Sequence, residues 1–133
     1  MEIKKVMNPK WWLIVLGALG ILLGSGNYID AENAAETGWG DDATEHDVFY
    51  EQAWGLMTLG VGITALATGL LVTGKPLAQM AMAGSGAQLL TFALLYTAGA
   101  DVDYGFSTPE MMGPPMIILL LLGVAGYLHK DDE

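Results

Sequence analysis

The sequence predicts an all-α integral membrane protein, a bundle of four helices that cross the bilayer with both termini in the cytoplasm. Three observations support this fold class. The chain of 133 residues is 53% hydrophobic and only 15% charged, against roughly 25% charged residues in an ordinary soluble domain. Its apolar residues gather in four long runs without charges, and its basic residues all lie outside those runs. We expect a single membrane domain over residues 1–133.

The first apolar run covers residues 11–29 and follows three lysines. Lysines before an apolar core, together with the small residues of Gly24-Ser25-Gly26, are also features of a cleaved secretory signal. We expect the segment to be retained, because the apolar run continues beyond that site to Ile29. A helix needs about 20 residues to cross the hydrocarbon core, so this run predicts the first span.

The other three runs cover residues 53–73, 77–98 and 111–128. None of them contains Asp, Glu, Lys, Arg or His, and each is long enough to cross a bilayer. Only a short turn around Lys75 and Pro76 separates the second run from the third. The second and third helices are therefore predicted to be antiparallel neighbours.

The lysines predict the orientation, since basic residues in short loops stay on the cytoplasmic side. With four crossings all five lysines fall on one side of the membrane: Lys4, Lys5, Lys10, Lys75 and Lys130. The termini are then cytoplasmic, and the loops 30–52 and 99–110 face outward from the plasma membrane. Most of the 15 acidic residues lie in these two outer loops, so the net charge of −10 belongs mainly to the outer face. Such a face excludes nucleic acid as a partner and attracts cations.

Glycines recur in every predicted span, where they allow close contact between helices in lipid. They are Gly20 and Gly24, then Gly55, Gly60, Gly62 and Gly69, then Gly84 and Gly86, and finally Gly123 and Gly126. These faces can meet within one chain or between chains. Besides the lipid bilayer, the expected partners are therefore another membrane protein or further copies of this chain.

One candidate binding site lies at the outer start of the second span. Thr44 and Asp47 have the spacing of a helix cap. On the helix that follows, His46, Tyr50 and Trp54 recur every four residues on one face. This face predicts an interfacial pocket for a quinone-like ring, and the alternative is a surface histidine beside two aromatic membrane anchors.

Polar side chains within the spans form a second candidate set. Gln88 lies in the middle of the third span, with Ser85 and Thr91 each about one turn away, and Thr64 lies at similar depth in the second span. The first interpretation is hydrogen bonding between helices. The alternative is a path for a small neutral solute.

The outer loops supply a third candidate set, of carboxylates. Oxygen ligands of this kind suit calcium or another divalent cation. The predicted ligands are Asp41, Asp42, Glu45, Asp47, Asp101 and Asp103. The alternative is a solvating acidic coat, since the run from Asp101 lacks the terminal Glu of a helix–loop–helix calcium site and has Met112 there.

The layout resembles the small four-helix membrane proteins of the DoxX-like group over the whole chain. The resemblance rests on a short inner amino terminus, a first span ending near residues 24–29, an outer loop, a glycine-rich second span that begins at Trp54-Gly55, a tight inner turn, and Glu110 before the last span. It implies a four-helix membrane fold. Some members of the group are subunits of membrane oxidoreductases that deliver electrons to quinone.

The sequence carries no recognisable catalytic motif. A nucleophile elbow, a phosphate-binding loop and a His-Glu-x-x-His zinc motif are all missing, and the lack of cysteine excludes disulfides and iron–sulfur clusters. We therefore predict a non-catalytic subunit or accessory component of a membrane complex. A quinone-linked redox subunit and a small oligomeric channel or carrier for a neutral solute are the alternatives. Quinone and a divalent cation are the two candidate cofactors.

Overall fold

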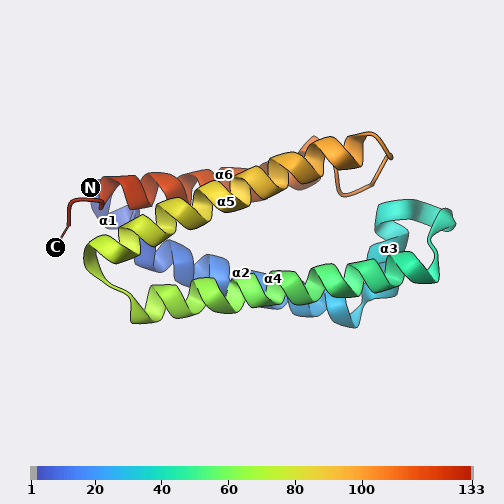
Figure 1. Cartoon of the computed structure of the whole chain (residues 1–133), viewed down its shortest axis with the longest axis horizontal. Helices are drawn as coiled ribbons and strands as arrows, with labels where there is room; N and C mark the ends of the chain where they lie inside the picture. Colours follow the sequence, from blue (N-terminus) through green and yellow to red (C-terminus); the bar gives the residue numbers. More distant parts are fainter. Residues whose placement is uncertain (1–2, 133) are drawn as a thin grey trace.

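The computed structural model describes residues 3–132 and is all-α over that range. Four long helices run side by side along the molecule (Figure 1): α2 (Pro9–Ile29), α4 (Glu45–Leu71), α5 (Gly74–Ala100) and α6 (Pro109–Leu128). Three short elements complete the chain: α1 (Ile3–Val6), α3 (Ala31–Trp39) and the 3₁₀ turn η1 (Gly40–Asp42). The predicted all-α class is therefore confirmed, and the segment 30–52, which was predicted to be a loop, contains a helix of its own.

Three of the four long helices are long and apolar enough to cross a membrane. They are α4, α6, and α2 taken together with α1. Helix α5 is as long as α4, at 27 residues, but it does not reach the same apolarity. Its glutamines, Gln79 and Gln88, lower its mean hydropathy. The sequence prediction of a membrane protein is thus supported by three helices, and the fourth crossing stays a prediction.

Three of the four long helices are capped at their start by a side chain, and α5 is not. Asn8 accepts a hydrogen bond from the amide of Lys10 at 3.0 Å, ahead of Pro9 in the first turn of α2. At α4 the predicted cap is confirmed, since Thr44 and Asp47 satisfy each other's backbone amides. Thr108 caps α6, which starts at Pro109, before the predicted span. These caps provide acceptors for amides that have no partner inside the helix.

Helices α2 and α4 form the first hairpin, and their contact depends on glycine. A Cβ atom added at Gly24 would lie 2.4 Å from the backbone nitrogen of Leu59, and one at Gly62 would lie 2.6 Å from that of Ile21. Such distances are below van der Waals contact, so only glycine lets the two backbones come this close. The glycines of the first two spans therefore meet largely within one chain.

Helices α5 and α6 form the second hairpin, which is closed by small residues and one buried hydrogen bond. The hydroxyl group of Ser85 donates to the carbonyl oxygen of Leu119 at 2.6 Å. A Cβ atom at Gly126 would lie 2.7 Å from the carbonyl oxygen of Ala78. Gly84 and Gly86 face open space and are not used in this contact.

The two hairpins pack on each other through a small apolar core. Its buried members are Leu13 on α2, Leu77 and Ala81 on α5, and Leu122 on α6.

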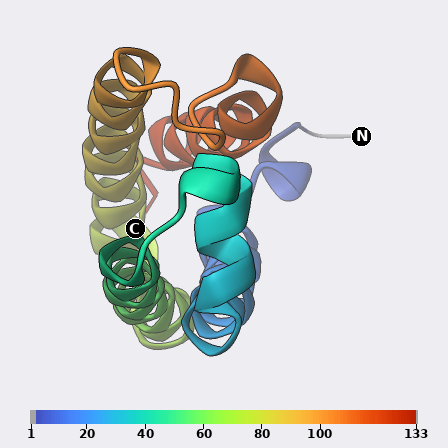
Figure 2. The ribbon, with the colours of Figure 1, turned by 90° about the vertical axis from the view of Figure 1, so that its right-hand side faces the viewer.

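At one end of the molecule, α3 crosses from the end of α2 toward the loop before α6 (Figure 2). The amide of Gly105 in that loop donates to the carbonyl oxygen of Gly38 at 2.8 Å. We call this end of the molecule the α3 end.

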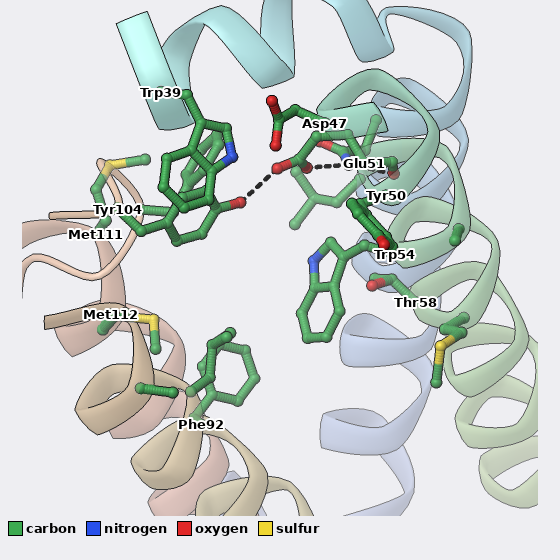
Figure 3. A pocket seen from close by; sticks show the side chains of 18 of the residues that line it. Trp39, Asp47, Tyr50, Glu51, Trp54, Thr58, Phe92, Tyr104, Met111 and Met112 are labelled. Carbon is green, nitrogen blue, oxygen red and sulfur yellow. Dashed lines mark hydrogen bonds between the residues drawn. The ribbon is translucent and has the colours of Figure 1, made fainter. Parts of the chain in front are cut away.

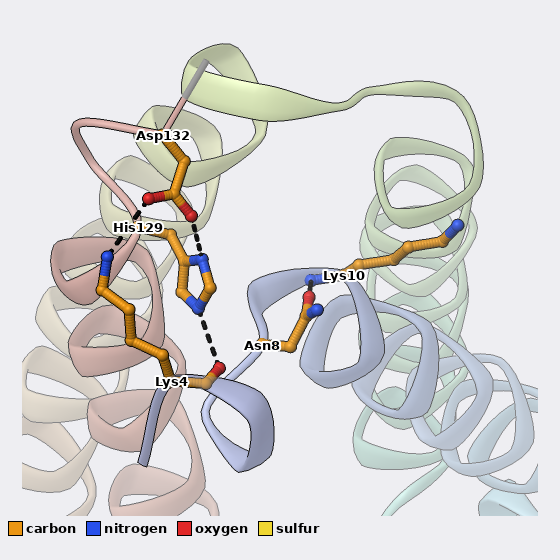
Figure 4. Close-up of polar contacts among 5 residues, drawn as sticks. All are labelled: Lys4, Asn8, Lys10, His129 and Asp132. Atoms are coloured by element: carbon orange, nitrogen blue, oxygen red, sulfur yellow. Dashed lines mark hydrogen bonds and ion pairs between the residues drawn. The ribbon is translucent and has the colours of Figure 1, made fainter. Parts of the chain in front are cut away.

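Both termini lie together at the other end of the molecule (Figure 1). There the imidazole of His129 contacts a carboxyl oxygen of Asp132 at 2.5 Å and the carbonyl oxygen of Lys4 at 3.0 Å (Figure 4). The ammonium group of Lys4 contacts the other carboxyl oxygen of Asp132 at 3.2 Å. The hydrogen bonds from His129 and Lys4 lower the pKa of the Asp132 carboxyl group. The contribution of this carboxylate to stability is therefore present at neutral pH and lost as the pH falls through the lowered pKa.

Candidate functional site

A cavity of about 710 Å³ lies between the two hairpins at the α3 end. Its walls come from α2, α3, α4, α5, α6 and the loop between α5 and α6. Aromatic side chains contribute much of the lining: Trp39, Tyr50, Trp54, Phe92, Tyr104 and Phe106. We call this space the α3-end cavity, and Figure 3 shows it from close by.

A buried carboxyl group is part of the cavity wall. Glu51, on the first part of α4, is only 5% exposed. The hydroxyl group of Tyr104 donates to one of its carboxyl oxygens at 2.5 Å, and the amide of Asn27 donates to the other at 2.9 Å (Figure 3). The same amide nitrogen also donates to the main-chain carbonyl oxygen of Glu51 at 2.8 Å. Glu51 thus joins α2, α4 and the loop before α6.

Tyr104 is held in place by the loop around it. Its ring packs against the ring of Trp39, with centroids 5.1 Å apart, and against Phe106 at 5.5 Å. A Cβ atom at Gly38 would lie 2.4 Å from the Tyr104 ring, so the absence of a side chain there makes room for it. Burial, and then the hydrogen bond to Glu51 and its charge, raise the pKa of Tyr104. The phenol therefore remains a hydrogen-bond donor to the carboxyl group.

The predicted set of His46, Tyr50 and Trp54 is only partly brought together. Tyr50 and Trp54 line the α3-end cavity, and His46 lies outside its lining, exposed in the first turn of α4. The pocket thus has the two predicted aromatic residues but not the predicted histidine. Its polar contribution comes instead from Glu51 with Asn27 and Tyr104.

The polar residues within the spans do not share a common space. Thr64 donates to the carbonyl oxygen of Gly60 at 2.9 Å, and Thr91 donates to that of Ala87 at 3.0 Å. Ser85 donates across to α6, as described above, and Gln88 lies half-buried on α5. The one interhelical bond of this set is that of Ser85. None of the four residues lines the α3-end cavity.

The carboxylates predicted to hold a divalent cation are not assembled into a site. Between residues 3 and 132, no three acidic or histidine side chains form a group that could hold a metal ion. Asp41 and Asp42 lie in η1, and Asp101 and Asp103 lie in the loop after α5. Glu45 is exposed at the start of α4. The carboxyl group of Asp47 is already used by Thr44, whose amide donates to it at 2.8 Å.

The sequence prediction missed Asn27 and Tyr104 and counted Glu51 only as part of an acidic loop. One signal was available in the sequence. Glu51 lies three residues before Trp54 and therefore shares a helix face with it. The contact with Tyr104 spans 53 positions of the chain, and no local pattern indicates such a pairing.

Comparison of the chain with family models, with curated proteins and with solved structures found no match.

Proposed function

We propose that this chain is a small multi-pass membrane protein that holds an apolar ligand in the α3-end cavity without converting it chemically, as an accessory component of a membrane complex. In this proposal all four long helices cross the plasma membrane, with both termini in the cytoplasm. The DoxX-like layout is part of the same proposal. The structure supplies three sufficiently apolar helices.

The distribution of charge supports this orientation. The lysines lie in α1, in the first turns of α2 and α5, and just after α6, and these segments lie at one end of the molecule (Figure 1). The acidic segment 30–51 and the acidic loop around Asp101 and Asp103 lie at the α3 end. Because basic residues favour the cytoplasmic side, we place the α3-end cavity at the outer surface of the membrane.

The single observation that carries the proposed function is the α3-end cavity itself. Its volume of about 710 Å³ falls within the roughly 300–1,000 Å³ typical of small-molecule sites. Its lining is mainly aromatic and aliphatic, with few polar groups. Such a surface favours a molecule that already partitions into lipid, and an apolar ring or chain entering it would lose contact with water.

The alternative functions receive less support from the geometry. A quinone site built on His46 is not formed, because that histidine lies outside the cavity lining. A solute path through Thr64, Ser85, Gln88 and Thr91 receives less support, since the three hydroxyl groups are bonded to helix carbonyl oxygens and none of the four residues lines the α3-end cavity. The α3-end cavity is therefore the feature on which we base the proposed function.

Native mass spectrometry of the protein, extracted from its own membrane in a mild detergent, tests the proposal. The matched variants are Ala98→Phe, which places a ring in the cavity lining, and Ala93→Phe, which adds the same ring to an exposed position of α5 outside the lining. We expect the parent and Ala93→Phe to retain a small apolar molecule, and Ala98→Phe to lose it. Equal retention by both variants, or no retained molecule in any sample, would overturn the proposal.

The same spectra test the accessory role. Co-extraction of other polypeptides at fixed stoichiometry supports a place in a membrane complex. A chain that is stable and always alone contradicts that part of the proposal and leaves ligand binding to be judged from the variants.

A further inference from the structure

We propose that the α3-end cavity selects lipophilic cations, in which one positive charge is carried by apolar rings or chains, over neutral or anionic molecules of the same shape. This inference rests on the proposed function and adds the charge of the ligand to it. The source of such a cation is either a free hydrophobic cation or the ammonium headgroup of a lipid.

The first argument is the sign of the charges in the cavity wall. Two carboxyl side chains, Glu51 and Asp47, contribute to the lining, and no Lys, Arg or His of the described chain does. An anionic ligand would therefore meet only charges of its own sign. A cation would find opposite charge at both positions.

The second argument is the state of Glu51. Its side-chain partners, the Asn27 amide and the Tyr104 hydroxyl group, are neutral donors. They satisfy the carboxyl oxygens as hydrogen-bond acceptors but supply no positive charge. A carboxylate that is 95% buried beside an apolar cavity is unfavourable unless a cation approaches it, so a cationic ligand in the cavity would balance the charge of Glu51.

The third argument is the aromatic lining. Trp39, Trp54 and Tyr104 lie around the space next to Glu51, and Phe92 lines the cavity farther from that carboxyl group (Figure 3). Aromatic faces attract cations electrostatically when the charge lies within about 6 Å of the ring centre, and they also pack against the apolar body of the ligand. Carboxylate and aromatic rings together recognise both parts of a lipophilic cation.

The surroundings of the cavity act in the same direction. The net charge of the chain is −10, and the lysines lie at the opposite end from the cavity (Figure 1). Clefts lined by charge of one sign concentrate ligands of the opposite sign. The acidic α3 end thus raises the local concentration of cations at the cavity entrance.

Three probes of similar shape and different charge test the inference. Tetraphenylphosphonium is cationic, triphenylphosphine oxide is neutral, and tetraphenylborate is anionic. Binding of each to the full-length protein in dodecyl maltoside is measured by equilibrium dialysis, with protein-free micelles as the blank. We expect saturable binding of the cation, at least about tenfold tighter than that of either other probe, because an opposite charge within about 4–6 Å shifts such equilibria by about one to three decades.

Matched variants locate the effect. Glu51→Gln removes the charge and keeps the shape, and it should weaken binding of the cation about tenfold or more. Asp41→Asn removes an exposed charge in η1 that is outside the cavity lining, and it should leave the affinity unchanged. The comparison of the three probes on the parent protein tests the charge preference even if Glu51→Gln does not fold.

The possible results separate this inference from the proposed function. Equal binding of all three probes, lost in Ala98→Phe, would overturn the charge preference and leave the apolar site. No saturable binding of any probe, with no molecule retained in native mass spectra, would overturn both. Displacement of tetraphenylphosphonium by phosphatidylethanolamine but not by phosphatidylglycerol supports a lipid ammonium as the ligand. Displacement by neither lipid supports a free cation.

Discussion

The hydroxyl group of Tyr104, in the loop before α6, lies 2.5 Å from a carboxyl oxygen of Glu51 on α4. This hydrogen bond connects the two helical hairpins at the α3 end. The buried apolar core that joins the hairpins includes Leu13, near the start of α2, and Leu122, near the end of α6, and it lies toward the termini. Together with the backbone hydrogen bond from Gly105 to Gly38, this contact closes the end of the molecule at which the cavity is found.

Tyr104→Phe tests how much this contact stabilises the fold. The variant keeps the ring packing on Trp39 and removes the donor to Glu51. We expect the free energy of unfolding to fall by about 1.5–3 kcal/mol, as for hydrogen bonds to charged groups. Tyr50→Phe is the control, because Tyr50 is 66% exposed. Unfolding by added sodium dodecyl sulfate, followed by circular dichroism, measures both, and equal effects of the two variants would refute the assignment.

The ionisation of Tyr104 supplies a test by pH. Burial and Glu51 raise its pKa above the ordinary value of about 10. Since the folded state holds this proton more tightly than the unfolded state, its contribution to stability is complete below about pH 10 and is lost as the pH rises through the raised pKa. At about pH 11, the folded parent and folded Tyr104→Phe should give equal tyrosinate absorbance, although the variant has one tyrosine fewer. A larger signal from the parent would show that Tyr104 ionises normally.

Two glycines of α4 test the packing of the first hairpin. A Cβ atom at Gly62 would lie 2.9 Å from the carbonyl oxygen of Gly17, and one at Gly60 would meet nothing within 4 Å. We expect Gly62→Ala to destabilise the protein by about 1–3 kcal/mol through overpacking. Gly60→Ala should be neutral or stabilising by up to about 1 kcal/mol, because alanine favours the helix. Thermal unfolding in detergent compares them, and similar melting temperatures would contradict the close contact.

Single cysteines test the proposed four crossings, and the natural absence of cysteine makes the background clean. An impermeant maleimide added to intact cells should label Asp41→Cys and Asp103→Cys. Lys75→Cys and Lys130→Cys should react only after the membrane is made permeable. Labelling of Lys75→Cys from outside, or of Asp103→Cys only after permeabilisation, would show that α5 does not cross as proposed.

Much of the fold follows from local patterns in the sequence. Long apolar runs predicted the long helices, and the Thr44–Asp47 spacing predicted the cap of α4. These features depend on residues within one or two helical turns. The pairing of α2 with α4 was not predicted, because glycine faces indicate close contact without naming the partner.

The site was predicted less completely, for a similar reason. Tyr50 and Trp54 were found because their spacing places them on one helix face. Asn27 and Tyr104 escaped because each meets Glu51 only after distant segments pack together. His46 shares the spacing and lies one turn before Tyr50, but its position is outside the cavity lining, and helical periodicity alone does not show where a pocket begins.

Photolabelling tests the central claim, that an apolar ligand is held in the α3-end cavity. A cationic alkyl diazirine is irradiated with the protein in detergent micelles, and the modified positions are mapped by peptide mass spectrometry. We predict adducts concentrated on cavity-lining residues of the first half of α4 and of the loop before α6, among them Trp54, Val102 and Phe106, and their loss in Ala98→Phe. Adducts spread evenly over the exposed faces of all four long helices, and unchanged in Ala98→Phe, would contradict the account.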